Sequence, residues 1–411
     1  MKRAIRLRWC SVLVVLALGS CVFTPSHQVP AAAKGPVTIP VDITGYGLIF
    51  LRARVNNSQA MWFALDSGAS FPFVIDIRRS KALGLKLQDT LTLERGAGSG
   101  AYEVAVTRGV SVNLGDLNFA DQTAAVISLG SLEAISGRAL DGLVGCDVFN
   151  RYVVELDYLG KKITLYDPKT YTYSGSGGSI PLTKSGDYFF VPVKIEMPGR
   201  PRLEGQFLVD TGGGFVTVIL NAPFARSNDL PAPTHRRILD RSLAGLGGET
   251  KLLVSRATSF TLGNLAISKP VVYVSQDTGG ALASRNFDGV IGGELLRRFK
   301  VIFDYGRHRL ILEKNAYYDE PIEYDMSGIR LRAEGDDFRT FRVSQVLENS
   351  PAAEARLREG DLLAAIDGAP ASSFSLDEIY QMLMRQGSEY KLSLRRGGEM
   401  FFVKIKMQRL I

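Results

Sequence analysis

The stretches FALDSGAS (residues 63–70) and FLVDTGGG (residues 207–214) decide how this chain is expected to fold. Each is a short apolar run that ends in an aspartate, a hydroxyl residue and a glycine. A charged aspartate at the end of a buried strand is costly unless its oxygens are satisfied or it has a chemical task. Two such sites in one chain therefore require a common explanation.

The two sites belong to a long internal repeat. Upstream, TIPV (residues 38–41) matches SIPL (residues 179–182). Downstream, DGLVGCDVFNRYVVELDYLGKKITLYD from Asp141 matches DGVIGGELLRRFKVIFDYGRHRLILEK from Asp288. The same order and nearly the same spacing recur over about 140 residues, which indicates duplication of a whole lobe rather than of a short motif.

Each copy is expected to be mostly β. The apolar runs that end at Asp66 and Asp210 are typical of buried strands. Residues 153–167 and 300–314 alternate around an Asp-Tyr turn and predict hairpins. Asp141, Asp288, Asp157 and Asp304 also recur, but we interpret them as turn residues without a catalytic role.

The pattern changes after about residue 318. Within NSPAAEARLREGDLLAAIDG (residues 349–368), Ser350 and Pro351 predict the start of a short helix. Residues 375–386 predict an amphipathic helix, with Ser375 and Glu378 forming a capping box. A strand-rich segment precedes these elements and a final hairpin follows them.

If the two lobes meet face to face, Asp66 and Asp210 meet as well. Two carboxyl groups about 3 Å apart cannot both ionise easily, so one keeps a proton and the other acts as a base. Such a pair can activate water for direct hydrolysis without a covalent intermediate. The neighbouring residues are expected to hold the pair, through hydroxyl hydrogen bonds and close backbone approach: Ser67, Gly68, Thr211 and Gly212.

Residues 37–318 resemble an aspartic protease of the retropepsin or pepsin type. The resemblance is carried by Asp-Ser-Gly-Ala at 66–69, Asp-Thr-Gly-Gly at 210–213 and the apolar-apolar-Gly elements at 143–145 and 290–292. It implies a mostly β fold, with two homologous retropepsin-like β-barrel lobes at 37–173 and 174–318. It also implies an aspartic endopeptidase that acts on polypeptides through Asp66 and Asp210, without a cofactor. The alternative is an inactive binding or scaffold protein with the same fold.

Two glycine-rich segments are candidates for flaps over the site. Pepsin-like proteases have a single flap that carries a Tyr, and GAGSGAY (residues 96–102) has Tyr102 just past its glycines. GLGG (residues 245–248) in the second copy could be a second flap, as in retropepsin dimers. No single flap residue is chosen from the sequence. The candidate positions are Gly98, Gly100, Tyr102, Gly245 and Gly247.

Residues 319–411 form a further domain of α+β type, and residues 322–411 resemble a PDZ domain. In that family a loop receives a peptide carboxylate and the peptide lies along a helix. The resemblance thus implies binding of peptide or protein C-termini. The corresponding positions here are Ser327, Gly328, Ile329, Arg330, Leu331, Ile379 and Leu383.

The N-terminus is typical of an export signal. A basic segment precedes the apolar residues 9–18, and residues 18–21 (LGSC) resemble a lipobox in which Cys21 would be acylated. Cleavage near residue 33 is the alternative. Residues 1–36 are therefore expected to be signal peptide and linker, and the protein to be periplasmic and anchored to a membrane.

Composition narrows the function further. Four of the seven excess positive charges lie before Cys21, so charge gives no reason to expect a nucleic-acid partner. The chain has three cysteines and three scattered histidines, which supports neither a disulfide nor a metal site. Cys146 is expected to be a small buried residue. Because both Asp sites lie in one chain, the catalytic unit is expected to be a monomer, with a dimer of chains as the alternative.

Overall fold

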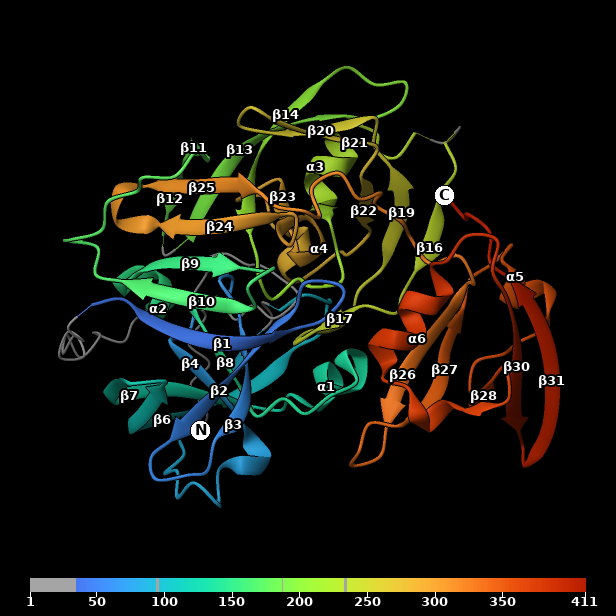
Figure 1. Ribbon diagram of the computed structural model, residues 1–411, viewed down its shortest axis with the longest axis horizontal. Coiled ribbons are helices and arrows are strands. Elements are labelled where there is room, and N and C mark those ends of the chain that lie inside the picture. The colour runs from blue at the N-terminus through green and yellow to red at the C-terminus, as the bar shows by residue number, and fades with distance from the viewer. Residues whose placement is uncertain (1–34, 94–95, 187, 233–234) are drawn as a thin grey trace, which may run out of the picture.

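Figure 1 shows the computed structural model of the chain, which describes residues 35–93, 96–186, 188–232 and 235–411. Two β lobes are stacked on one another, and a smaller red and orange domain lies beside both. The expected signal segment and Cys21 fall outside the described residues. Among the residues described, no helix is long and apolar enough to cross a membrane.

The first lobe is a β structure in which strands alternate between buried and exposed side chains, as in Ile49–Val55. Its strands are β1 (Val37–Ile43), β2 (Ile49–Val55), β3 (Met61–Leu65), β4 (Phe73–Asp76), β5 (Gln88–Leu93), β6 (Tyr102–Leu114), β7 (Leu117–Ile127), β8 (Gly142–Val144), β9 (Val153–Asp157) and β10 (Lys162–Tyr166). Its helices are η1 (Ile77–Arg79), α1 (Gly130–Ser136) and α2 (Cys146–Arg151).

The second lobe repeats this plan. Its strands are β11 (Gly178–Pro181), β12 (Thr183–Ser185), β13 (Tyr188–Glu196), β14 (Leu203–Val209), β15 (Val218–Leu220), β16 (Ile238–Asp240), β17 (Ala244–Gly245), β18 (Gly248–Glu249), β19 (Leu252–Arg256), β20 (Ser259–Leu262), β21 (Leu265–Ser268), β22 (Val271–Ser275), β23 (Gly289–Ile291), β24 (Phe299–Asp304) and β25 (Arg309–Lys314). Its helices are α3 (Ala222–Ser227), η2 (Ala281–Ala283), α4 (Gly293–Leu296) and η3 (Tyr305–Arg307).

Matching strand pairs show the duplication in three dimensions. In the first lobe β3 runs parallel to β8, and β8 pairs antiparallel with β4. In the second lobe β14 runs parallel to β23, and β23 pairs antiparallel with β15. The predicted hairpins are β9–β10 and β24–β25, as the repeat indicates. The expectation of a mostly β fold with two homologous lobes is confirmed.

The two lobes share one sheet. Strands β9 and β24 pair antiparallel, with Leu156 opposite Val301 and Val154 opposite Phe303. Beside this pairing, Phe149 of α2 packs edge-on against Phe303 with ring centroids 5.0 Å apart. Both rings are fully buried. The lobes are therefore joined by backbone hydrogen bonds and by a continuous apolar core.

The third part is an α+β domain with its own apolar core. Its strands are β26 (Ile329–Glu334), β27 (Thr340–Val346), β28 (Leu362–Ile366), β29 (Ala369–Pro370), β30 (Glu389–Arg396) and β31 (Glu399–Lys406). Its helices are α5 (Pro351–Glu354), η4 (Ala371–Ser373) and α6 (Leu376–Leu383). Ser350 caps α5, and Ser375 with Glu378 forms the capping box of α6, as the sequence indicates.

A buried arginine fixes the connection into this domain. The guanidinium of Arg298, at the end of α4, donates to the carbonyl of Tyr317 at 2.9 Å and to the carbonyls of Glu320 and Pro321. Its side chain is 1% exposed. These hydrogen bonds satisfy the buried charge and attach the segment at 317–321 to the second lobe.

We expect Phe149→Ala to lower the free energy of unfolding by about 3–5 kcal/mol, because it leaves a cavity between the lobes. Chemical denaturation monitored by intrinsic fluorescence measures this change. Leu159→Ala is the control, since Leu159 is 45% exposed and its loss should cost under about 0.5 kcal/mol. Equal losses in the two variants would contradict a shared interlobe core.

Candidate active site between the two lobes

Asp66 and Asp210 occupy equivalent places, each just beyond the end of a buried strand. The backbone N–H of Asp66 donates to the Val144 carbonyl at 2.9 Å, which continues the parallel pairing of β3 with β8. The N–H of Asp210 donates to the Ile291 carbonyl at 2.9 Å in the same way. The apolar-apolar-Gly elements of the sequence are thus the strands β8 and β23, which align both aspartates.

Symmetric hydrogen bonds connect the two aspartate loops across the lobe boundary. The Ser67 N–H donates to Thr211 Oγ1 at 3.0 Å, and the Thr211 N–H donates to Ser67 Oγ at 3.1 Å. Each hydroxyl donates onward to the opposite lobe, Ser67 Oγ to the Val209 carbonyl at 2.8 Å and Thr211 Oγ1 to the Leu65 carbonyl at 2.9 Å. All four groups are buried, so the loops can be separated only by losing these bonds.

The carboxyl groups themselves are held by glycine N–H groups. Gly68 donates to Oδ1 of Asp66 and Gly212 donates to Oδ1 of Asp210, both at 2.9 Å. A Cβ at position 212 would lie 2.6 Å from the Asp66 Cγ, so only glycine permits this approach. The second oxygen of each carboxyl, Oδ2, is buried and receives no protein N–H or hydroxyl donor from the described residues. Both Oδ2 atoms therefore remain available for a proton or a reacting group.

Burial and mutual repulsion keep this pair from ionising fully. Burial raises the pKa of Asp66 well above its usual range, and the charge of Asp210 raises it further. Burial raises the pKa of Asp210 to about 6, although the Gly212 N–H favours its charged form. The pair as a whole therefore retains a proton above the usual pKa range of a carboxyl group.

An apolar cavity opens beside Asp66. Its walls come from both lobes and include helix α1 of the first lobe. Few of the lining groups are polar. The lining residues are Leu48, Phe50, Ala64, Asp66, Leu132, Ile135, Ser136, Leu140, Leu143, Gly212, Gly213, Phe215, Val216, Leu243 and Ala244. Ala64, Asp66, Leu143, Gly212 and Gly213 lie in the motifs that the sequence reveals. The other lining residues come from segments that are distant in the chain and carry no motif.

The flap candidates lie against one another. Gly100 N–H donates to the Gly247 carbonyl at 2.8 Å, and Gly247 N–H donates to the Ala97 carbonyl at 2.9 Å. Gly98 has φ +89°, and a Cβ there would lie 2.4 Å from the Gly248 carbonyl oxygen. Gly245 pairs with Gly248 in the hairpin β17–β18. The glycines of the two segments thus permit direct tip-to-tip contact.

Tyr102 has a different position from these glycines. It begins strand β6 and packs at the edge of the apolar cluster that contains Leu48 and Phe50. It does not line the cavity beside Asp66.

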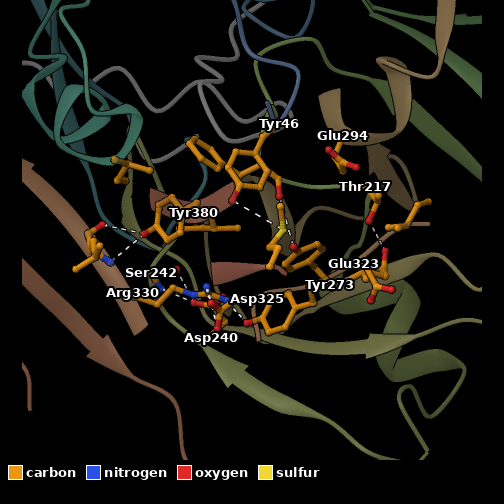
Figure 2. A pocket seen from close by; sticks show the side chains of 18 residues that line it. Tyr46, Thr217, Asp240, Ser242, Tyr273, Glu294, Glu323, Asp325, Arg330 and Tyr380 are labelled. Atoms are coloured by element: carbon orange, nitrogen blue, oxygen red, sulfur yellow. Dashed lines mark hydrogen bonds and ion pairs between the residues drawn. The ribbon is translucent and has the colours of Figure 1, made fainter. Parts of the chain in front are cut away.

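The expected peptide-binding residues of the third domain are buried. Ile379 and Leu383 belong to the domain core, together with Ile329 and Leu331. Arg330 forms an ion pair with Asp240 of the second lobe at 2.9 Å. Ser327 and Gly328 donate hydrogen bonds to the Asp325 carboxylate. These residues are therefore engaged within the chain, and Figure 2 shows Asp325, Arg330 and Tyr380 in the pocket where the domain meets the lobes.

The other repeated acids have structural partners. Asp141 accepts from the Trp62 N–H at 2.8 Å and from Arg79 at 2.6 Å, while Asp288 accepts from the Gln206 N–H at 2.8 Å. Asp157 accepts from the Gly160 N–H in its turn, and Asp304 pairs with Arg307 and Arg309. Cys146 is buried and donates to the Ser70 carbonyl.

Comparison with known proteins agrees with this division of the chain. Residues 51–148 match the family model described as aspartyl protease, and residues 322–395 match the model of the PDZ domain. The chain thus combines an aspartyl protease-like region with a C-terminal PDZ domain.

The curated relatives match over a short segment only. The periplasmic serine endoprotease DegP of Escherichia coli strain K12 is 39% identical over 67 residues, which are 16% of this chain and 14% of that protein. The same protein of Salmonella typhimurium strain LT2 is 37% identical over 67 residues, with the same shares. The match lies in the PDZ region, and this chain spans about one seventh of the length of those relatives. Among solved structures, an aspartic proteinase from Irpex lacteus has a TM-score of 0.46 and 16% identity, and the similarity covers 69% of this chain and 99% of that chain.

We expect Thr211→Val to destabilise the protein by about 1–3 kcal/mol, because it leaves the Ser67 N–H and the Leu65 carbonyl buried without this partner. The free energy of unfolding from urea titration measures the loss. Thr38→Val is the matched control, since Thr38 is exposed and its hydroxyl pairs only with Thr164. A loss no larger than that of the control would contradict the role of the cross-lobe bonds.

The raised pKa values of the pair also predict a dependence of stability on pH. Between 3.8 and the folded-state pKa of about 6, the folded protein binds more protons at Asp210 than the unfolded chain does. The free energy of unfolding should therefore fall as pH rises through this window, by roughly 1.4 kcal/mol per unit of pKa shift. The double variant Asp66→Asn/Asp210→Asn should lose this part of the dependence. If the free energy of unfolding changes with pH in the same way in wild type and in the double variant, the pair does not retain a proton.

Proposed function

We propose that the chain is an aspartic endopeptidase in which Asp66 and Asp210 together activate a water molecule. The observation that carries this proposal is the paired carboxyl groups at the lobe boundary, each with one oxygen held by a glycine N–H and the other oxygen without a donor. In a pair that shares one proton, the ionised carboxylate accepts a proton from water. The protonated partner donates to the carbonyl oxygen of the peptide bond as the tetrahedral intermediate forms.

Burial raises the pKa of both carboxyl groups, and the charge of Asp210 raises the pKa of Asp66 further. The pair therefore shares one proton, so that one carboxyl group acts as the acid and the other as the base. The apolar cavity beside Asp66 accommodates a substrate side chain, and polypeptides are the substrate class.

Export and anchoring belong to the same proposal. The basic and apolar N-terminal segment and Cys21 support an exported protein of the periplasm that is held at a membrane by a lipid on Cys21. Both halves of the site lie in one chain, which supports a monomeric catalytic unit. The PDZ domain supports binding of peptides, with C-termini of substrates or partners as the proposed ligands.

We expect purified protein to cleave an unfolded protein substrate, and both Asp66→Asn and Asp210→Asn to lower kcat/KM by roughly a hundredfold or more. Release of fluorescent fragments from dye-labelled casein measures the rate. Asp157→Asn is the control, because Asp157 lies in the repeated block but only stabilises a turn.

Two outcomes would count against the proposal. Cleavage that survives either single change would rule out a shared pair. No cleavage by the wild-type protein between about pH 4 and pH 8 would favour a binding or scaffold protein that retains the fold.

A further inference from the structure

In the PDZ domain, helix α6 lies against β26, which is an edge strand of the sheet. Domains of this class bind an extended peptide by adding it as a strand at such a sheet edge. We use the name PDZ groove for the region between β26 and α6, where Leu331 faces Tyr380. In this chain, each group that would receive a peptide already has a partner within the protein.

The first occupied element is the loop that leads into β26. The Asp325 carboxylate accepts from the Ser327 N–H at 3.2 Å, from Ser327 Oγ at 2.7 Å and from the Gly328 N–H at 2.6 Å. Asp325 is 5% exposed. The Asp325 carboxylate therefore already occupies the N–H groups that could bind the carboxylate of a peptide. It would repel a second carboxylate at the same place.

The second occupied element is the edge of β26. The hydroxyl of Tyr380, on α6, accepts from the Leu331 N–H at 2.9 Å and donates to the Leu331 carbonyl at 3.1 Å. An added strand would need these two backbone groups for its own hydrogen bonds. Tyr380 consequently links α6 to the edge of β26, and Figure 2 shows its two hydrogen bonds as dashed lines.

The third element is helix α1 of the first lobe, which packs against both β26 and β17. Figure 1 shows α1 between the lobes and the PDZ domain. The C-cap of α1, Gly137, lies so close to α6 that a Cβ there would come within 2.6 Å of the Leu376 Cβ. Ile135 of α1 lines the pocket at the PDZ groove and also lines the cavity beside Asp66. Helix α1, together with Phe215 and Leu243 of the second lobe, thus lies between the pocket at the PDZ domain and the cavity beside Asp66.

The polar contacts that join the PDZ domain to the lobes include the buried Arg330–Asp240 ion pair and two contacts near α1 and the β17–β18 hairpin. The Asp377 carboxylate of α6 accepts from the Gly45 N–H of the first lobe, with both oxygens at 3.0 Å. Arg332 of β26 pairs with Glu249 of the hairpin β17–β18 at 2.8 Å. The hairpin also contributes Ala244 to the wall of the Asp66 cavity. The PDZ domain therefore contacts two walls of that cavity, α1 and the hairpin.

We propose that the PDZ domain restrains cleavage by holding α1 and the β17–β18 hairpin against the Asp66 cavity. Release of the domain frees α1, widens the cavity and raises the rate at which a polypeptide is cleaved. The effect on cleavage rests on the proposed protease function, whereas the restraint on α1 does not. A peptide strand that pairs with β26 must displace Tyr380 and α1. Peptide binding in the PDZ groove would therefore also widen the cavity beside Asp66.

The test is the full-length variant Asp377→Ala/Arg332→Ala, which removes the two contacts near α1 and the hairpin and leaves the aspartate pair, the PDZ core and the buried Arg330–Asp240 ion pair intact. Glu389→Ala is the matched control, because it removes an exposed ion pair with Lys404 on the distant hairpin β30–β31. Hydrogen exchange of residues 130–136 reports on α1 independently of activity. Cleavage of dye-labelled casein reports on the cavity, and the single variants Arg332→Ala and Asp377→Ala show whether the two effects add.

We expect exchange in α1 to become at least about tenfold faster in the double variant and casein cleavage to rise severalfold, with neither change in Glu389→Ala. Unchanged α1 exchange in the folded double variant would overturn the proposal. Faster exchange with an unchanged cleavage rate would overturn the link between α1 and catalysis. A third outcome is faster α1 exchange in the double variant while neither wild type nor any variant cleaves casein. That outcome would support the restraint on α1 and overturn the protease function.

Discussion

The structure depends on holding two carboxyl groups together in a buried place, where each disfavours the ionisation of the other. The reciprocal bonds between Ser67 and Thr211 meet this requirement, since each residue both donates to and accepts from the opposite lobe. The shared β9–β24 pairing and the packing of Phe149 on Phe303 supply the apolar burial that keeps the lobes in register. Without that burial, the raised pKa values of the pair would not persist.

Much of this arrangement could be predicted from the sequence, because duplication turns weak local signals into strong ones. Asp66 and Asp210 and their supporting residues follow from the repeat, and the hairpins and the capping box of Ser375 and Glu378 follow from local rules. The walls of the Asp66 cavity could not be predicted. Ile135, Phe215 and Leu243 come together only through tertiary packing, and an apolar residue in a short helix has the same pattern whether it lines a cavity or fills a core. The roles expected at Cys21, at the flap glycines and at the PDZ residues remain predictions.

Arg330 illustrates why such positions are difficult to assign from a family resemblance. Its place at the start of β26 suggests contact with a peptide, yet its guanidinium is buried against Asp240, which also accepts a hydrogen bond from the Tyr324 hydroxyl at 2.8 Å. Burial alone would raise the pKa of Asp240, but the Arg330 charge and the hydrogen bonds from Ser242 and Tyr324 bring that pKa below its usual value. The partner of Arg330 lies 90 residues away in the chain, so no local pattern could reveal it.

The two halves of the site are carried by one chain, and this has a consequence for how a polypeptide would lie across it. In a symmetric dimer the two directions along the cleft are equivalent. Here Ser67 faces Thr211, and the cavity with its α1 wall adjoins Asp66. The two carboxyl groups therefore have chemically different surroundings. The two directions in which a polypeptide could lie across the pair are not equivalent.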